Sequence, residues 1–169
     1  MVVANCFKNR LAAMASKKGV MGVELVFREI VPEDAAVLAA IEAESIAMPW
    51  NREMFWEELG NPDTFYLAAV VEGEVVAFVG CWLLSGEADI TNVAVRSKYR
   101  RQGIARRLLI ELIRRLKMQG ITAVSLEVRE SNIPAIALYS GLNFKHSGIR
   151  PNYYQNPPEN AIIMWKTDL

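Results

Sequence analysis

The sequence predicts one α/β domain, in which a mixed, mostly antiparallel β-sheet is flanked by helices. Its 169 residues suffice for a single buried core, and the composition of 52% hydrophobic and 22% charged residues is typical of a packed protein. Segments with strand patterns alternate along the chain with segments of helical periodicity, without an internal repeat or low-complexity linker. We therefore expect one domain over residues 23–169, preceded by a flexible N-terminal extension at residues 1–22.

The first half of the domain begins with an alternating stretch, "VELVFREI", which predicts a strand over 23–30. A helix is expected next over 32–46, since Pro32 and two acidic residues occupy its first turn. The "MPW" stretch then interrupts the helical pattern. Asn51 is a suitable N-cap, so a second, short helix is predicted over 52–59.

The middle of the chain predicts a hairpin, a strand and a long helix. Two β-rich runs within 64–84 flank "EGE", which indicates a hairpin, and a strand rich in β-branched residues follows over 87–96. Gly120 marks the C-terminal end of the helix that comes next. The apolar residues with helical spacing in it are Ile104, Leu108, Leu109, Leu112, Ile113 and Leu116.

The C-terminal part returns to strand over 122–129 and to helix over 133–142, where Pro134 occupies the first turn. The stretches "FKHSGI" (144–149) and "AIIMWKTD" (161–168) are expected to be closing strands. Between them, "RPNYYQNPPEN" is interpreted as a loop that is aromatic and only mildly charged.

Charge and hydropathy argue against two classes of function. Lys and Arg total 19 and so do Asp and Glu, whereas a dedicated nucleic-acid-binding domain usually has a strong basic excess. No apolar run approaches the roughly 20 residues that a membrane-spanning helix needs. These features predict neither direct nucleic-acid binding nor membrane insertion, although a local basic patch is still possible.

Cysteine and histidine are too few for a disulfide framework or a metal site. Cys6 and Cys81 stand alone, and the chain has a single histidine, His146. We interpret the cysteines as reduced thiols in a cytoplasmic protein, with Cys81 packed in a strand. His146 lies between Lys145 and Ser147 and is interpreted as an ordinary surface residue.

The stretch "YRRQGIARRLL", residues 99–109, is either a basic arm for nucleic acid or a loop that binds a phosphate at the start of a helix. A helix entered through Gly103 presents unpaired N–H groups and the positive end of its dipole, and Arg101 and Arg106 can flank the same anion. The motif is neither a Walker loop nor a Rossmann fingerprint. The even charge balance favours the phosphate loop. The later basic residues, Arg107, Arg114, Arg115 and Lys117, are expected to form a solvated helix face paired with Glu111.

"RRQGIA" (100–105) matches the Gln/Arg-x-x-Gly-x-Gly/Ala signature of the GNAT acetyltransferase superfamily. With "NVAV", "LEVRESNIPAIALYSGLNF", "RPNYYQNPPENAIIM" and "MPW", the chain resembles its RimI-type members over residues 24–166. Those enzymes acetylate the N-terminal alanine of the eighteenth protein of the small ribosomal subunit. Two departures are Ala105 in place of the commoner glycine and Asn143 in place of the glycine of "LGF"; asparagine tolerates the left-handed turn expected there.

The resemblance implies a GNAT fold and acetyl-coenzyme A as co-substrate, without a metal. Backbone groups of Val93, Ala94 and Val95 are implied to hold the pantetheine arm as an added strand would. Asn132 is implied to contact the cofactor, although its simpler role is to cap the next helix. The residues implied to bind the pyrophosphate are Arg101, Gln102, Gly103, Ile104, Ala105 and Arg106.

The resemblance assigns a general base to Glu127 and a general acid to Tyr139. An α-amine has a pKa near 8, so roughly a tenth of it is neutral at pH 7 and a modest base suffices, whether it acts directly or through water. A phenol remains protonated at that pH and can protonate a departing thiolate. The structural alternatives are a surface Glu127, or one paired with Arg129, and a Tyr139 that merely packs in the core.

The acceptor is implied to be a ribosomal protein N-terminus, held by Met48, Pro49 and Trp50 together with Tyr153 and Tyr154. These five residues would equally suit a core or a surface. Another amine, such as a lysine side chain or a small polyamine or antibiotic, is the first alternative acceptor. A nucleic-acid- or ribosome-binding module is the second alternative, and the even charge balance disfavours it. We expect a monomer.

Overall fold

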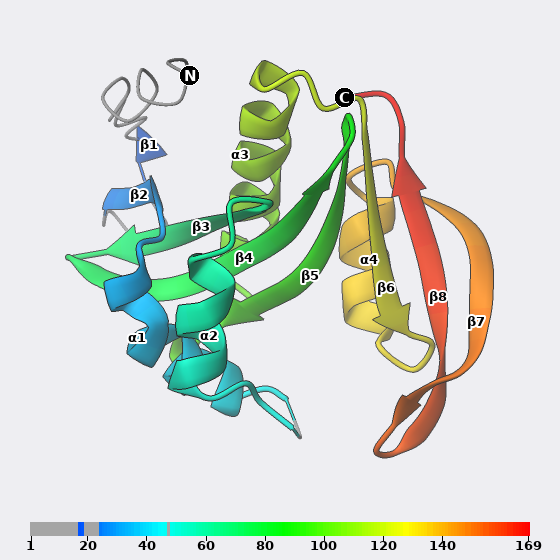
Figure 1. Cartoon of the computed structure of the whole chain (residues 1–169), viewed down its shortest axis with the longest axis horizontal. Coiled ribbons are helices and arrows are strands. Elements are labelled where there is room, and N and C mark those ends of the chain that lie inside the picture. Colours follow the sequence, from blue (N-terminus) through cyan, green and yellow to red (C-terminus); the bar gives the residue numbers. More distant parts are fainter. Residues whose placement is uncertain (1–16, 19–23, 47) are drawn as a thin grey trace, which may run out of the picture.

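The computed structural model describes residues 17–18, 24–46 and 48–169, and most of the expected extension lies outside them. Within these residues the strands form one eight-stranded sheet in the order β1-β2-β3-β4-β5-β6-β8-β7 (Figure 1). Only the β5–β6 pair is parallel among the described strands, so the predicted mixed, mostly antiparallel sheet is confirmed. The strands are β1 (Lys17–Lys18), β2 (Glu24–Glu29), β3 (Thr64–Val71), β4 (Glu74–Leu84), β5 (Glu87–Val95), β6 (Ala123–Arg129), β7 (Lys145–Gln155) and β8 (Pro158–Lys166). The α-helices are α1 (Ala35–Ala43), α2 (Arg52–Leu59), α3 (Ile104–Met118) and α4 (Ile133–Ser140).

Local sequence signals account for most element boundaries. Asn51 caps α2 as predicted, because its side-chain oxygen accepts a hydrogen bond from the Met54 N–H at 2.9 Å. Gly120 follows α3 with a φ of 84°, the left-handed conformation that a helix stop favours. The helix predicted over 32–46 is shorter than expected: a 3₁₀ turn at Pro32–Asp34 precedes α1, which ends at Ala43.

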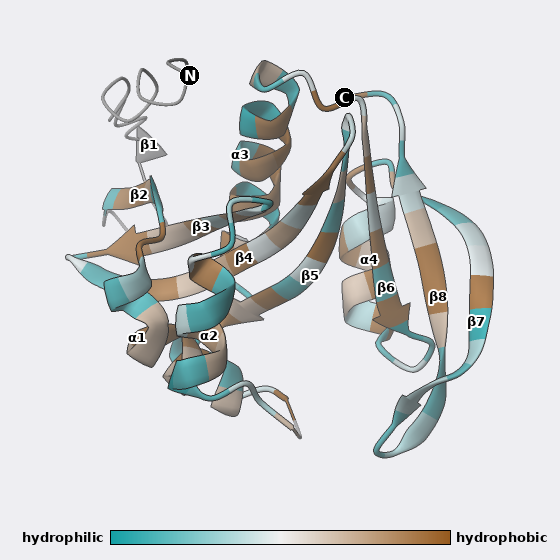
Figure 2. Ribbon diagram, in the orientation of Figure 1, coloured by the Kyte–Doolittle hydropathy of each residue, from teal (hydrophilic) through white to brown (hydrophobic). Residues whose placement is uncertain are grey.

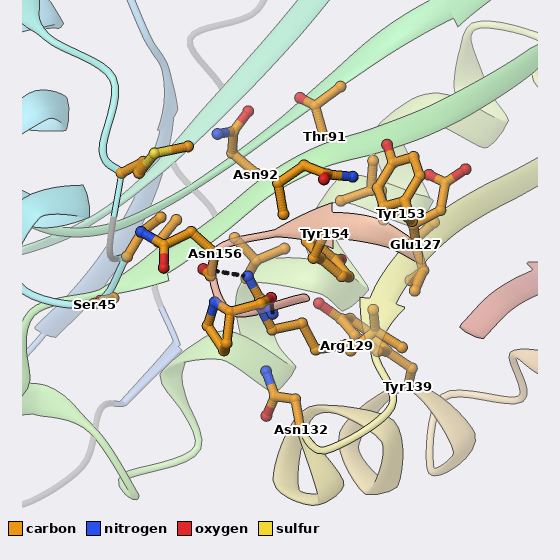
Figure 3. A pocket seen from close by; sticks show the side chains of 18 residues that line it. Ser45, Thr91, Asn92, Glu127, Arg129, Asn132, Tyr139, Tyr153, Tyr154 and Asn156 are labelled. Atoms are coloured by element: carbon orange, nitrogen blue, oxygen red, sulfur yellow. Dashed lines mark hydrogen bonds between the residues drawn. The ribbon is translucent and has the colours of Figure 1, made fainter. Parts of the chain in front are cut away.

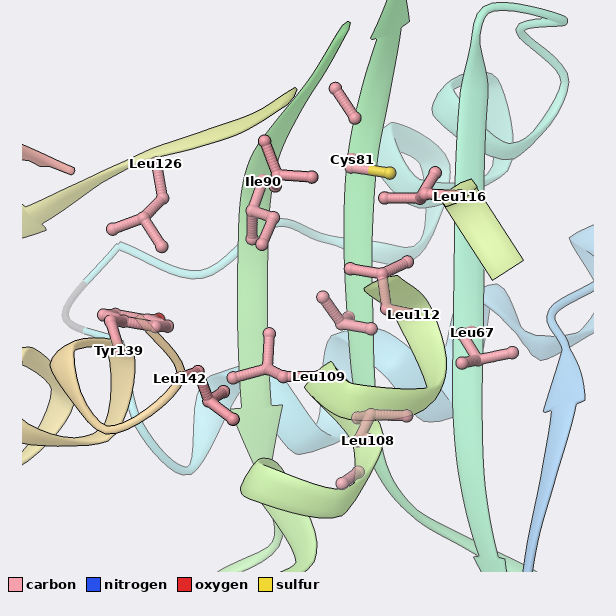
Figure 4. Packing of buried hydrophobic residues seen from close by; sticks show 14 of the residues in the cluster. Leu67, Cys81, Ile90, Leu108, Leu109, Leu112, Leu116, Leu126, Tyr139 and Leu142 are labelled. Carbon is pink, nitrogen blue, oxygen red and sulfur yellow. The ribbon is translucent and has the colours of Figure 1, made fainter. Parts of the chain in front are cut away.

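Strand alternation divides the core between the two faces of the sheet. Leu67 and Ala69 of β3 belong to the cluster covered by α3 and α4, whereas Tyr66 and Ala68 belong to the cluster covered by α1 and α2. Figure 4 shows the leucines of α3 lying over β3, β4 and β5. Cys81 is fully buried in β4, as predicted. The hydropathy colouring likewise places the apolar stretches of the ribbon along the sheet and the inner faces of the helices (Figure 2).

The sheet divides after β5. Pairing between β5 and β6 runs from Glu87–Ala123 to Ile90–Leu126 and then stops, so the following residues of the two strands separate. The segment from β6 to β8 therefore diverges from the rest of the sheet (Figure 1), and α4 lies beside this point. Among the described strands, none pairs with this edge of β5 from Thr91 onward.

The C-terminal hairpin differs from the prediction. The stretch 150–160, expected to be a loop between two short strands, mostly continues them: β7 extends to Gln155 and β8 begins at Pro158. The pairing is irregular between Arg150 and Tyr154, and its polar, proline-containing sequence resembles that of a loop. His146 lies exposed on β7, as predicted.

Candidate active site

A cavity of about 660 Å³ opens where β5 and β6 separate. Its walls come from both strands, the α1–α2 loop, α4 and the end of the β7–β8 hairpin (Figure 3). The structure therefore brings together residues from four of the five sequence motifs, whereas no residue of the fifth, "RRQGIA", lines the cavity. The predicted site residues that line it are Met48, Val93, Glu127, Asn132, Tyr139, Tyr153 and Tyr154.

The open edge of β5 is set by its pairing with β4. The Arg96 N–H donates to the Val76 carbonyl at 2.9 Å, and antiparallel pairs alternate between bonded and non-bonded positions. Val93 and Val95 consequently direct their N–H and C=O groups away from β4, toward the separation. Ala94 directs its own groups to β4 and buries its side chain under α1, so the edge is provided by Val93 and Val95 rather than by all three predicted residues.

The predicted phosphate loop has the geometry of an anion site. Arg101 and Gly103 adopt positive φ angles of 61° and 75°, which turn the chain into α3. Arg107 is the first helical residue whose N–H reaches back one turn, to the Gly103 carbonyl at 3.1 Å, so the amides of 104–106 precede the ladder. A Cβ built on Gly103 would meet nothing within 4 Å. The loop can accordingly admit a pyrophosphate close to its backbone.

The side chains of this loop divide into inward and outward groups. Ile104 is buried and anchors the start of α3, and Gln102 donates to the Lys98 carbonyl at 3.0 Å within the loop itself. Arg101 and Arg106 are exposed, whereas Ala105 is half-buried. Arg101 and Arg106 therefore have their side chains in solvent, where charge can reach an anion.

Arg100 connects the predicted phosphate loop to β5 and to the loop between α1 and α2. Its guanidinium donates to the Val95 carbonyl at 2.9 Å, to the Glu44 carbonyl at 3.1 Å and to the Ser45 hydroxyl at 2.7 Å. Ser45 lies in the α1–α2 loop and lines the cavity. Arg100 thus links the open strand edge to that loop, a contact that the sequence motif did not indicate.

Glu127 projects from β6 into the cavity and is largely buried. Its Oε1 lies 3.1 Å from Arg150 Nη2, so its ion-pair partner is on β7 and not Arg129, the partner considered from sequence. Burial raises the pKa of Glu127, the nearby Asp89 raises it further, and Arg150 opposes both effects. A carboxylate with a raised pKa at a cavity wall is suited to accept a proton near neutral pH.

Tyr139 extends from α4 into the same cavity. Its ring packs edge-to-face on Phe144, with centroids 5.9 Å apart, and the residue is 7% exposed. Burial raises the pKa of Tyr139 to about 12, and Tyr154 adds to this effect. The hydroxyl therefore remains protonated at neutral pH. Tyr139 both packs in the core and lines the cavity, so the two roles considered from sequence coexist.

The predicted acceptor residues separate into two groups. Tyr153 and Tyr154 line the cavity and pack edge-to-face at 5.1 Å, and Met48 also faces it. Pro49 and Trp50 do not line the cavity. The Trp50 ring lies 5.4 Å from that of Phe55, in the core beneath α1 and α2.

A buried carboxylate on α1 was not recognised in the sequence. Glu42 is 1% exposed; its oxygens accept from the Trp50 N–H at 2.8 Å and from Asn92 Nδ2 at 2.7 Å. Asn92 lines the cavity, so Glu42 supports both the α1–α2 loop, which contains Trp50, and strand β5. The one available signal was a charged residue in the apolar run "AAVLAAIEA".

Asn132 has both of the roles considered for it by position: its side chain accepts a hydrogen bond from the Ala135 N–H at 3.3 Å and so caps α4, and it also lines the cavity.

Two arginines of α3 share one carboxylate. Glu111 binds Arg115 at 2.8 Å and Arg114 at 2.7 Å, and the two arginines lower the pKa of Glu111 to about 2. The predicted pairing of Glu111 with Arg115 is confirmed, but these two side chains are not on a solvated face: Glu111 is buried, and Arg115 donates to the Phe27 carbonyl of β2. No group of three or more metal-ligating side chains occurs among the described residues. Nor is any helix in that part of the chain long and apolar enough to cross a membrane.

Comparison with known proteins agrees with this geometry. The family model "Acetyltransferase (GNAT) family" matches residues 35–144. [Ribosomal protein bS18]-alanine N-acetyltransferase of Escherichia coli (strain K12) is 40% identical over 127 residues, which cover 73% of this chain and 84% of the relative. The corresponding Haemophilus ducreyi protein is 37% identical over 140 residues, covering 80% and 94%.

The fold comparison gives the same result. The crystal structure of the ribosomal-protein-S18-alanine N-acetyltransferase from Escherichia coli superposes with a TM-score of 0.80 at 33% identity, covering 86% of this chain and 95% of that one. The structure of Ard1 from Thermoplasma volcanium superposes with a TM-score of 0.78 at 28% identity, covering 86% and 98%. The fold therefore belongs to a known architecture, and this chain is a member of the GNAT family of acetyl-coenzyme A-dependent N-acetyltransferases.

Proposed function

We propose that the protein transfers the acetyl group of acetyl-coenzyme A to the N-terminal α-amine of a protein, with Glu127 as general base and Tyr139 as general acid. The observation that carries this proposal is that both side chains line one cavity, beside the open edge of β5. Relatives at 37–40% identity are named as bS18-alanine N-acetyltransferases. We accordingly propose the N-terminal alanine of that ribosomal protein as the acceptor.

The residues present fit the co-substrate, which supplies an acetyl group activated as a thioester. The outward N–H groups of Val93 and Val95 and the carbonyl of Val93 would hold its pantetheine arm as a neighbouring strand would, since the Val95 carbonyl already accepts a hydrogen bond from Arg100. The free amides at the start of α3, with Arg101 and Arg106, would bind its pyrophosphate. Asn132, on the α4 side of the cavity, would complete the contacts.

The proposed chemistry combines one acyl exchange with the loss of two protons from the amine and the gain of one proton by the thiolate. Glu127 accepts a proton from the α-ammonium, directly or through water, and the amine nitrogen then bonds to the acetyl carbon as the carbon–sulfur bond breaks. Tyr139 donates its hydroxyl proton to the departing thiolate. The nitrogen loses its second proton to solvent as the amide forms. Glu127 returns the first proton to solvent and Tyr139 is reprotonated from solvent, so one proton is released in each cycle.

The acceptor side favours a chain end of low charge density over a polyamine. Tyr153, Tyr154 and Met48 contribute aromatic and apolar surface, and Arg150 and Arg129 lie beside the tyrosines.

The alternative of nucleic-acid binding is less well supported. Because Arg114 and Arg115 both pair with Glu111, α3 offers nucleic acid less free positive charge than its sequence suggests. We expect a cytoplasmic monomer that contacts the ribosomal protein through its N-terminus.

The test is acetylation of matched peptides by the purified protein. A peptide beginning with alanine should gain the mass of one acetyl group at its α-amine. The same peptide with a blocked α-amine and a free lysine should react poorly, because very little lysine is neutral at pH 7. Equal rates on the two peptides would identify a lysine acetyltransferase. Mass spectrometry of ribosomal proteins from cells with and without this protein should show loss of acetylation on one small-subunit protein.

A further inference from the structure

Arg129, the last residue of β6, contacts the end of the β7–β8 hairpin at four places. Its guanidinium donates to the Asn156 carbonyl at 3.0 Å and to the Pro157 carbonyl at 3.1 Å. It also binds Glu159 Oε2 at 2.9 Å and lies 4.1 Å from the centre of the Tyr154 ring. Figure 3 shows this side chain beside Asn156 at the hairpin end, among the residues that line the cavity. One side chain thus satisfies two carbonyls, one carboxylate and one aromatic face.

The buried core gives this region of the hairpin little support, and its other contacts are polar, such as the Arg150–Glu127 ion pair and the hydrogen bond from the Asn152 N–H to Asn160. Within the described part of the chain, β7 places no side chain in the buried core, and its pairing with β8 is irregular between Arg150 and Tyr154. Tyr153 is 45% exposed. Apolar burial therefore contributes little to the position of the segment 153–157, although all five of its residues line the cavity.

Glu159 connects the hairpin to the loop between β6 and α4 as well as to Arg129. While one of its oxygens binds Arg129, the other accepts a hydrogen bond from the Ser131 N–H, in the β6–α4 loop. That loop leads directly into Asn132 and α4, which carries Tyr139. Arg129 and Glu159 together hold the hairpin against the loop that precedes the proposed general acid.

We propose that Arg129 is a positioning residue that fixes the acceptor side of the cavity, through the hairpin end at 153–157. This inference rests on the proposed function for its kinetic consequence, because it assigns those residues to the acceptor and not to acetyl-coenzyme A. A planar guanidinium suits the task, since it can contact several acceptors and a ring face at once, which a lysine ammonium cannot.

The kinetic test compares Arg129→Ala and Arg129→Lys with the unmodified protein. For Arg129→Ala, the KM for an alanine-initiated peptide should rise about tenfold or more, because several charge-assisted bonds are lost. The KM for acetyl-coenzyme A should stay within about twofold and kcat should fall less than the acceptor KM rises. Arg129→Lys keeps the charge but not the planar guanidinium, so its acceptor KM should lie between those of the unmodified protein and Arg129→Ala.

The matched control is Arg28→Ala. Arg28 also pairs with a carboxylate, through two bonds of 2.6 and 2.8 Å to Asp34, but lies outside the cavity. This variant should leave the acceptor KM unchanged. Hydrogen exchange gives a readout independent of activity: amides at 152–156 should exchange faster in Arg129→Ala, whereas those of β3 and β4 should not. If Arg129→Ala does not fold, Glu159→Gln is measured in its place, since it weakens one of the same contacts.

Two results would overturn the inference. One is unchanged acceptor KM and unchanged exchange at the hairpin end. The other is a parallel loss of kcat and of the affinity for both substrates, which a general structural role would produce. If the unmodified protein acetylates no alanine-initiated peptide, the proposed function fails, and hydrogen exchange still decides whether Arg129 holds the hairpin.

Discussion

Arg150 Nη2 lies 3.1 Å from Glu127 Oε1, which places a half-exposed cation of the hairpin against the proposed general base. An α-ammonium that approaches Glu127 would compete with Arg150 for the same carboxylate. The Arg150 guanidinium lies 5.6 Å from the centre of the Tyr153 ring, so it has an aromatic surface to occupy when displaced. The pair therefore keeps the carboxylate compensated before an acceptor arrives.

Replacing Arg150 should change the pH dependence of acetyl transfer. Activity needs ionised Glu127, so it is lost as pH falls through the pKa of that carboxyl. Burial and Asp89 raise this pKa and Arg150 lowers it; hence Arg150→Gln should move the acidic limb of kcat/KM to higher pH. Lys145→Gln removes a positive charge from the same strand and should leave the limb in place. Coincident acidic limbs for Arg150→Gln and the unmodified protein would show that Arg150 does not act on Glu127.

Glu127→Gln should slow acetylation of an alanine-initiated peptide at pH 7. Removing a general base typically costs about a hundredfold or more in rate. Raising the pH should restore part of the rate, because more of the α-amine becomes neutral without help. Steady-state rates between pH 7 and about 9 measure this effect. A variant with the unmodified rate at pH 7 would assign the base to another group.

Tyr139→Phe should lower turnover by about two orders of magnitude while preserving the fold. The ring contact with Phe144 is retained and only the hydroxyl is lost. Affinity for acetyl-coenzyme A, measured by calorimetry, should barely change. Because the pKa of Tyr139 is raised to about 12, its ionisation should not limit activity below that pH. Unaltered turnover, with chemistry shown to be rate-limiting, would remove Tyr139 from the mechanism.

Gly103→Glu should abolish binding of acetyl-coenzyme A. The new carboxylate would stand where the pyrophosphate is expected, and like charges repel. Gly73→Glu is a matched control, since Gly73 also has a positive φ, of 81°, and a Cβ there likewise meets nothing within 4 Å. Both variants should lose similar stability from backbone strain, but calorimetry should show lost binding only for Gly103→Glu. Normal binding by a folded Gly103→Glu protein would contradict the loop assignment.

Local patterns predicted the elements whose boundaries depend on local physics. The Asn51 cap, the apolar face of α3 and the β3–β4 hairpin are all encoded by neighbouring residues. Trp50 could not be placed in this way, because only the packing of α1 against α2 decides that its ring faces Phe55. The resemblance selected Glu127 and Tyr139, whereas composition and spacing alone allowed both a surface and a core role.

Ion-pair partners were the least predictable part of the site. Glu127 and Arg129 are two residues apart on β6 and share one face of the strand, which made their pairing a reasonable alternative. The hairpin instead supplies a separate partner to each, Arg150 to Glu127 and Glu159 to Arg129. These partners are 23 and 30 residues distant in the chain, so the register of β7 and β8 determines them.

The short parallel ladder between β5 and β6 makes the site a joint between two halves of the molecule. Four residue pairs, from Glu87–Ala123 to Ile90–Leu126, connect the half with the open strand edge to the half with the proposed base and acid. This ladder sets the distance between the two halves together with the buried core, in which Tyr139 packs in one cluster with the leucines of α3. Ser125 donates to Asp89 across it. Ser125→Ala would remove this bond between the two halves without replacing a residue that lines the cavity.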